Sequence, residues 1–198
     1  MSRISHRKGG LIARGSAWYA RRVYGKVPEP VLVAAHNPAV LRGYVASEWE
    51  LGRARRVDER LRALAEIKMG ALVGCEYCLD IGSMISRKAG VTEDQLRDLP
   101  RYRESEHFDE LERLVLDYAT AMAQTPVDVT DDLVDALKRH LDEAQIVELT
   151  AAIAWEGYRA RFNHALGIEP QGFTRGACAV PERPGVAAAE RPPATAST

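Results

Sequence analysis

The sequence predicts an all-α fold, and three observations carry this prediction. Residues that cap helix N-termini, such as Asn, Asp and Thr, stand repeatedly before apolar residues spaced three and four apart. Glycine or proline follows most of these runs and ends them. No segment competes with them by showing the alternation that is typical of a half-buried strand. At 198 residues the chain is long enough for one substantial core, so one domain is expected.

Start and stop signals divide the first half of the chain into helices. Asn37-Pro38 supplies an N-cap followed by proline in the first turn, and Asp58 is a second N-cap. Gly74 and Gly90 suit the residue that ends a helix, and Thr92-x-x-Gln95 is a capping box. The helices expected from these signals cover residues 38–51, 59–73, 76–89 and 93–99. The first 25 residues are ambiguous, with one candidate helix around residues 16–24.

The second half of the chain continues the helical pattern. We expect a long helix from Ser105 to the Thr125-Pro126 pair, and another from Thr130 to about Leu141. A capping box at Asp142-x-x-Gln145 then opens a helix that reaches about Leu166. From Pro181 the composition shifts to Pro, Ala, Arg and Thr, which predicts a disordered tail. The expected organisation is an N-terminal extension (1–27), a helical domain (28–170) and a C-terminal extension (171–198).

Charge and hydropathy exclude several classes of function. The 27 Lys and Arg residues nearly balance the 28 Asp and Glu residues, which argues against a nucleic-acid binder even though the N-terminal segment is basic. No apolar run approaches the roughly 20 residues that span a bilayer, and no secretory signal is visible. We therefore expect a cytoplasmic protein that partners neither nucleic acid nor membrane.

The Cys75-x-x-Cys78 motif is the feature that points to chemistry. It follows Gly74 and falls at the expected start of the helix over residues 76–89. Unpaired N–H groups and a partial positive charge at a helix N-terminus favour the thiolate, which is the reactive form. A second thiol three residues away can capture an oxidised sulfur as a disulfide. The motif therefore indicates a redox-active dithiol.

Two structural alternatives for the cysteine pair remain open but are less favoured. A chance pair of small buried residues is expected within an apolar stripe, whereas this pair stands where a helix begins. A structural zinc site needs four ligands, yet Cys178 stands alone near the C-terminus, where we expect a spectator, and the five histidines lack ligand spacing. We therefore expect no metal and no other cofactor.

The segment from Glu66 to Cys78, EIKMGALVGCEYC, followed by AGVTEDQL at residues 89–96, resembles the carboxymuconolactone decarboxylase / AhpD-like superfamily. The shared pattern is a helix, a Cys-x-x-Cys at the start of the next helix, and then the AG–T segment. The resemblance is strong over residues 58–99 and extends through the helical pattern to residue 166. It implies an AhpD-like helical bundle that assembles into a homo-oligomer, from dimer to hexamer.

The resemblance also implies roles for the two cysteines. In AhpD-like peroxidases the second cysteine attacks a hydroperoxide and becomes a sulfenic acid, and the first resolves it to a disulfide. Cys78 would then be the peroxidatic thiol, and Cys75 the resolving thiol and proton donor. An external dithiol or thiol would reset the pair.

The family's proton relay does not carry over to this sequence. Ala63 stands where the family has a glutamate twelve residues before the first cysteine, and Gly82 stands where it has a histidine. Glu66 lies one helical turn after Ala63 on the same face, so it is a candidate general base, with a surface ion pair as the alternative. Tyr77 and Asp80 are weaker candidates for support, through substrate positioning or proton transfer, with packing and helix capping as their alternatives.

One further polar group stands on the last expected helix. Arg159 and Asn163 are four residues apart and share a face, and we expect structural pairing there rather than anion binding.

The function expected from the motif and the resemblance is thiol-dependent reduction of a hydroperoxide. One alternative is a cofactor-free lyase like carboxymuconolactone decarboxylase, whose members typically lack the cysteine pair. The other is a non-catalytic helical oligomer in which the disulfide acts as a redox switch.

Overall fold

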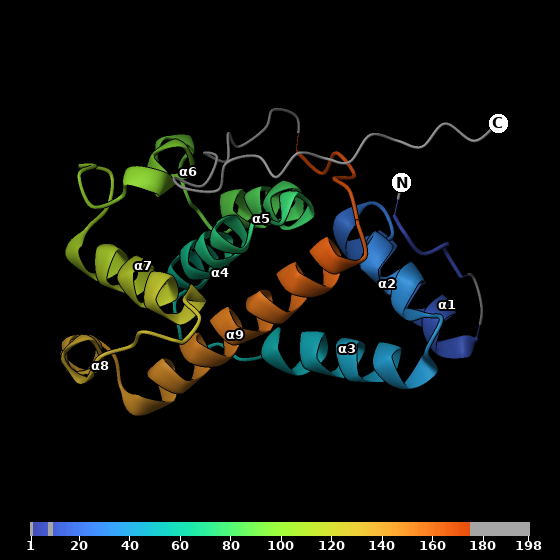
Figure 1. Cartoon of the computed structure of the whole chain (residues 1–198), viewed down its shortest axis with the longest axis horizontal. Helices are drawn as coiled ribbons and strands as arrows, with labels where there is room; N and C mark the ends of the chain where they lie inside the picture. Colours follow the sequence, from blue (N-terminus) through green and yellow to red (C-terminus); the bar gives the residue numbers. More distant parts are fainter. Residues whose placement is uncertain (1, 8–9, 175–198) are drawn as a thin grey trace.

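The computed structural model describes residues 2–7 and 10–174, and every regular element within them is helical (Figure 1). The elements are α1 (Leu11–Tyr24), α2 (Glu29–Ala34), α3 (Pro38–Leu51), α4 (Glu59–Val73), α5 (Glu76–Lys88), α6 (Glu93–Asp98), the 3-10 turn η1 (Leu99–Arg101), α7 (Glu110–Ala123), α8 (Asp131–Lys138) and α9 (Glu143–Ala165). The predicted all-α fold is confirmed. Cys178 and the tail expected from Pro181 lie outside the described residues.

Helix α4 is the centre of the bundle, and it packs against α5, α7 and α9. The long helix α9 runs diagonally across the molecule in Figure 1, with α3 on one side and α4 and α5 on the other. Apolar side chains of α4, α7 and α9 interlock into one core, which includes Ala65, Met69, Val115, Ala119, Leu149 and Ile153. A separate cluster surrounds the cysteine pair, so the site is built on rigid, buried elements.

The predicted caps are confirmed at the starts of α3, α4, α6 and α9. Asn37 accepts the N–H groups of Ala39 and Val40, and Asp58 accepts those of Arg60 and Leu61. The capping boxes at Thr92–Gln95 and Asp142–Gln145 are both formed. These side chains satisfy N–H groups that a helix start leaves without backbone partners.

The predicted start of the long helix at Ser105 is wrong. Helix α7 begins at Glu110, because Asp109 and Glu112 form a capping box that satisfies the first N–H groups there. The Ser105 hydroxyl instead donates to Asp98 and accepts the backbone N–H of His107. Phe108 lies in the loop before this helix and is buried in a second core, which also includes Ala63, Leu64, Leu79 and Leu116.

The N-terminal region holds more helix than the sequence predicts. Helix α1 starts at Leu11 rather than near residue 16, and α2 was not predicted at all, since Pro28 caps it without a side-chain hydrogen bond. Helix α8 ends at Lys138, three residues before the expected Leu141. Among the described residues, no helix is both long enough and apolar enough to cross a membrane.

Candidate active site

The cysteine pair occupies the turn between α4 and α5. Gly74 ends α4 with a left-handed backbone (φ 78°), which glycine adopts without strain. Cys75 then caps α5, and its Sγ accepts the backbone N–H of Cys78 at 3.1 Å. The two sulfurs are joined as a disulfide across a Cα–Cα distance of 5.2 Å. The N-terminus of α5 therefore acts most directly on the sulfur of Cys75.

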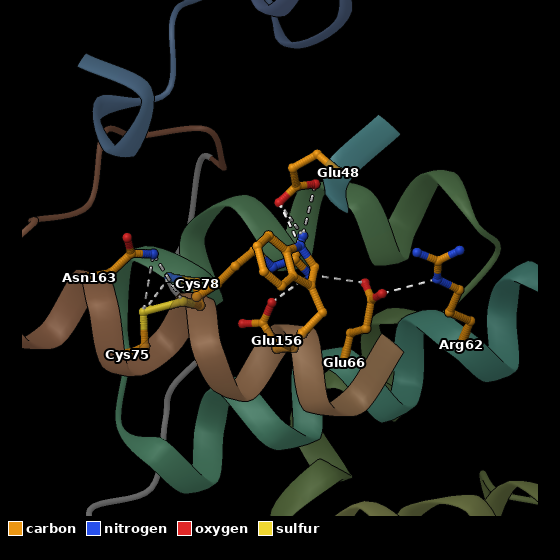
Figure 2. A network of polar contacts seen from close by, with 9 residues as sticks. Glu48, Arg62, Glu66, Cys75, Cys78, Glu156 and Asn163 are labelled. Atoms are coloured by element: carbon orange, nitrogen blue, oxygen red, sulfur yellow. Dashed lines mark hydrogen bonds and ion pairs between the residues drawn. A yellow bond between two sulfur atoms is a disulfide. The ribbon is translucent and has the colours of Figure 1, made fainter. Parts of the chain in front are cut away.

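Both cysteines are buried beneath α9. Cys75 is 2% and Cys78 6% exposed. Asn163, on α9, points its Nδ2 at Cys78 Sγ, 3.5 Å away, and lies 4.0 Å from Cys75 Sγ (Figure 2). Its Oδ1 is buried without a hydrogen-bond partner. A polar contact from α9 thus reaches both sulfurs, and it falls closer to Cys78.

Three carboxylates from three helices converge on one guanidinium, and we call this group the Arg159 cluster. Arg159 on α9 lies 2.6 Å from Glu156, 3.2 Å from Glu48 on α3 and 3.5 Å from Glu66 on α4. Glu66 also accepts the Nε of Arg62 at 3.0 Å (Figure 2). Even with Arg62 included, the acidic groups outnumber the basic ones by one. The expected structural pairing of Arg159 is confirmed, and its partners lie within the chain.

Glu156 and Cys78 approach each other at Gly70, in the last turn of α4. A Cβ on Gly70 would lie 3.1 Å from Glu156 Oε1 and 3.3 Å from the Cβ of Cys78. Both distances are tighter than ordinary van der Waals contact, so only glycine leaves this space open. Gly70 therefore lets a buried carboxyl border the same gap as the cysteine.

Burial raises the pKa of Glu156 from 4.5 to about 7, because the charged form is poorly solvated there. Arg159 opposes this shift, while the charges of Glu66 and Glu48 add to it. The same burial holds the pKa of Tyr44, on α3 beside the cluster, well above its usual range, so its hydroxyl stays neutral. Glu156 thus exchanges a proton near neutral pH.

The structure places the other candidates as follows. Glu66 belongs to the Arg159 cluster, where it is paired with both Arg62 and Arg159. The Tyr77 hydroxyl is buried without a partner, and burial raises its pKa far above the usual range. Neither result tests a catalytic role, so both assignments stay predictions.

Asp80 holds the C-terminal segment of the described chain. Its carboxylate accepts the backbone N–H groups of Gln171, Phe173 and Thr174, as well as the Thr174 hydroxyl. Partial burial alone would raise the pKa of Asp80, but these hydrogen bonds outweigh it and lower the pKa. Through these contacts Asp80 has a structural role, since it anchors the segment from Gln171 to Thr174. Its predicted support of the thiols stays a prediction.

The positions that depart from the family pattern are apolar here. Ala63 is buried in the second core with Leu64 and Leu79, and Gly82 faces Ile67. No acid–base group stands at either position. The structure supplies polar groups near the sulfurs from α9 instead.

Sequence reasoning missed Glu156 and the contact of Asn163 with the sulfurs. The available signal was a polar stripe on α9: residues 156, 159 and 163 recur at helical spacing and interrupt an otherwise apolar face. Such a stripe on a buried helix indicates a polar partner across the interface. Which partner it meets depends on packing against α3, α4 and α5.

The site shows no gathered metal ligands. Within residues 2–7 and 10–174, no group of three or more His, Cys, Asp or Glu side chains is placed to hold a metal ion. A surface hollow of about 460 Å³ lies beside Phe173 and Thr174, and neither cysteine is among its lining residues.

Comparison with known proteins identifies the family that this chain resembles. Residues 38–121 match the Carboxymuconolactone decarboxylase family. The protein YnjA of Escherichia coli (strain K12), which is uncharacterized, is 35% identical over 176 residues, covering 87% of this chain and 93% of its own. YdfG of Bacillus subtilis (strain 168), also uncharacterized, is 27% identical over 112 residues, covering 56% of this chain and 76% of its own.

Solved structures share the fold. The alkylhydroperoxidase AhpD core protein of Ralstonia eutropha JMP134, described as peroxidase-related, superposes with a TM-score of 0.76 at 21% identity, covering 87% of this chain and 94% of that one. A variant of the debrominase Bmp8, in complex with 2,3,4-tribromopyrrole, gives a TM-score of 0.76 at 19% identity, covering 86% and 92%. At these identities the similarity shows the AhpD-like helical fold.

Proposed function

Because this chain belongs to the carboxymuconolactone decarboxylase family, we propose that it is a thiol-dependent hydroperoxide reductase, in which Cys75 and Cys78 cycle between dithiol and disulfide. The observation that carries the proposal is the disulfide itself, formed at the start of α5 and buried against polar groups of α9. A dithiol that closes within the native fold can complete a turnover without rearranging the helices. The peroxidase-related structural neighbours agree with this chemistry.

The proposed cycle has three balanced steps. The Cys78 thiolate attacks the O–O bond of a hydroperoxide, which yields a sulfenic acid and releases an alcohol after protonation. The Cys75 thiol then attacks the sulfenic sulfur, forming the disulfide and releasing water. An external dithiol or thiol reduces the disulfide by exchange and is itself oxidised. Because that reductant needs a reducing compartment, we place the activity in the cytoplasm.

The two sulfurs receive different support. Cys75 accepts the N–H of Cys78, which stabilises a Cys75 thiolate during exchange with the reductant. Cys78 lies closer to Asn163, whose Nδ2 is an available donor for a Cys78 thiolate. This arrangement is compatible with attack by Cys78 and resolution by Cys75.

The test is a single-turnover reaction of the reduced protein with cumene hydroperoxide. A Cys178→Ser background leaves Cys75 and Cys78 as the only thiols, since the chain has three cysteines. We expect both thiols to disappear for each peroxide consumed. In the Cys75→Ser variant a sulfenic acid should accumulate on Cys78 and react with dimedone.

Three outcomes would contradict the proposal. Peroxide that persists while both thiols stay reduced would exclude the reductase. A reaction on the family's lactone substrates that survives replacement of both cysteines would favour the lyase. Slow oxidation coupled to a change in particle size would favour the redox switch.

We also propose that the protein is a homo-oligomer. The large apolar side chains of α1 that face solvent are Leu11, Ile12, Trp18, Tyr19 and Val23. Trp49 on α3 is also exposed, and its ring contacts that of Tyr19 at a centroid distance of 6.1 Å. Several large apolar side chains exposed on one short helix and its neighbour are a feature that subunit interfaces often share. Light scattering measures the molar mass of the wild type and of Trp18→Ala, and we expect the variant to assemble less. A monomeric wild type would contradict the proposal of an oligomer.

A further inference from the structure

The proposed cycle needs a group that takes the proton from Cys78 and returns it to the leaving alkoxide. The positions that supply this relay in the family are Ala63 and Gly82 here, and both are apolar. The carboxylate of Asp80 is engaged by the segment from Gln171 to Thr174. The Tyr77 hydroxyl stays protonated, because burial raises its pKa far above the usual range. Glu76 stands next to Cys75 but is exposed to solvent, whereas the acids of the Arg159 cluster include a buried carboxyl that borders Cys78.

We propose that Glu156 is the proton acceptor and donor for the Cys78 thiol, acting across the space that Gly70 leaves open between α4, α5 and α9. This inference rests on the proposed dithiol cycle and assigns its missing proton carrier. Three observations support it: the shared border at Gly70, the burial of the carboxyl, and the excess of acids around Arg159. Glu66, by comparison, forms a further ion pair with Arg62, which Glu48 and Glu156 do not share.

The charge balance of the cluster explains why one acid must carry a proton. Glu48, Glu66 and Glu156 share Arg159, and Arg62 neutralises one more charge. Taking three carboxylates into a poorly hydrated interface with two cations leaves one negative charge without compensation. The proton settles on the most deeply buried acid, because that acid gains least from water. Glu48 and Glu66 are more exposed than Glu156, so the excess proton belongs to Glu156.

The proposed steps conserve atoms and charge. Because its pKa is about 7, Glu156 is ionised in part of the molecules near neutral pH. There its carboxylate takes the proton of the Cys78 thiol, which gives a thiolate beside the neutral acid that the charge balance of the cluster favours. The thiolate displaces alkoxide from the hydroperoxide and becomes a sulfenic acid, and Glu156 returns its proton to the alkoxide. The carboxylate is thereby regenerated before Cys75 closes the disulfide. A base whose pKa lies near the working pH suits both transfers.

The pH dependence of Cys78 depends on every ionisable group that faces Glu156. These groups are Arg159 on α9, Glu66 and its partner Arg62 on α4, Glu48 and Tyr44 on α3, and Cys78 on α5. Burial holds the pKa of Tyr44 well above its usual range, and the neighbouring carboxylates outweigh burial and hold the pKa of Arg159 above its usual range. Under this proposal Glu156 and Cys78 titrate as a coupled pair that shares one proton.

The test measures Cys78 by itself, in a reduced Cys75→Ser/Cys178→Ser parent. Its rate of alkylation by iodoacetamide is followed from about pH 5 to about pH 9, a range that spans both expected titrations. We expect two steps in the parent, because the thiolate forms first beside a neutral and then beside an ionised Glu156. Glu156→Gln should leave a single step. In the Cys178→Ser protein the same substitution should slow peroxide reduction by about 100-fold near pH 7, since the alkoxide loses its proton donor.

Two matched variants separate this role from a structural one. Glu148 lies on the same helix, is similarly buried, and accepts the backbone N–H groups of Arg56 and Val57 far from the sulfurs. Glu148→Gln should lower the melting temperature and leave both alkylation steps in place. Glu66→Gln should keep both steps and move the lower one to lower pH, because it removes a negative charge beside Glu156.

The outcomes are distinguishable. Two unchanged steps in Glu156→Gln would overturn the inference, and loss of the lower step in Glu66→Gln would assign the proton to Glu66 instead. If Glu156→Gln does not fold, Glu66→Gln decides, and an unmoved lower step would overturn the proposal. If the unsubstituted protein reduces no hydroperoxide, the proposed function fails, yet the alkylation profile still tests the pairing of Glu156 with Cys78.

Discussion

Two buried glutamates in different regions show how partners decide what a carboxyl group does. Glu112, where α6 meets α7, is 2% exposed, and Glu156, where α9 crosses α4, is 6% exposed. Glu112 receives two contacts from Gln95 Nε2, the backbone N–H of Asp109 and an ion pair with Arg60. Glu156 pairs with Arg159, which it shares with two other carboxylates.

The difference lies in the balance of donors and acceptors. Around Glu112 one carboxylate meets an amide, a backbone N–H and a guanidinium, so its charge is compensated and the group ties its helix to α4 and α6. Around Glu156 acids exceed bases, so burial raises its pKa to about 7. Equal burial thus yields a structural anchor in one region and a titratable group in the other.

The largest expected effect comes from removing the anchor. Glu112→Ala leaves Gln95, the Asp109 N–H and Arg60 without their acceptor, and it should lower the free energy of unfolding by about 2–4 kcal/mol. Arg60 is partly exposed and contributes the smaller share of this loss. Urea unfolding measures the change. A loss below about 1 kcal/mol would show that Glu112 is not a structural anchor, and its contrast with Glu156 would no longer hold.

A comparable effect is expected from pH at Glu156. Between its ordinary pKa of 4.5 and its folded pKa of about 7, the folded protein holds a proton that the unfolded chain has released. Stability from this group is therefore full below about pH 4.5 and declines as the pH rises to about 7, by about 3 kcal/mol in total.

Glu156→Gln carries no ionisable group and should lack this decline. The difference in unfolding free energy between wild type and variant, measured by urea titration across this range, isolates the contribution of Glu156. Parallel curves for the two proteins would show that Glu156 titrates normally in the folded state.

An intermediate effect is expected at Gly70, where the titratable region meets the dithiol. Alanine is favoured over glycine in a helix by about 1 kcal/mol, but its Cβ would press on Glu156 Oε1 and the Cβ of Cys78. We expect Gly70→Ala to change stability by no more than about 1 kcal/mol while slowing peroxide reduction about tenfold or more. Gly43→Ala, whose Cβ meets nothing within 4 Å, is the matched control for helix propensity.

The smallest effect is expected at Asp80, whose carboxylate, like that of Glu112, accepts hydrogen bonds from several donors. Asp80→Asn weakens the hold on residues 171–174 and should raise their amide exchange, with a loss of about 1 kcal/mol in global stability. The alkylation profile of Cys78 should not change. A shift of that profile would mean that Asp80 acts on the thiols, as its position two residues after Cys78 allows.

Much of the fold was predictable because helix ends are encoded locally. A cap such as Asp58 or Asp142 meets N–H groups two or three residues away, so its effect does not depend on distant packing. The start of α7 was misplaced because Ser105 and Asp109 both suit an N-cap, and only Asp109 is matched by Glu112 three residues on. Helix α2 carries no such side-chain signal, and it forms because its residues are buried against α1 and α3.

The sequence by itself determined the helices, the position of Cys75 and Cys78 at the start of one of them, and the resemblance to the family. Those features depend on neighbours within a few residues. Only the tertiary structure brought Glu156 and Asn163 of α9 to the cysteines and gathered Glu48, Glu66 and Glu156 around one arginine. The physical reason is that a shared proton depends on burial and on the sum of nearby charges, which arise only when helices from distant parts of the chain pack together.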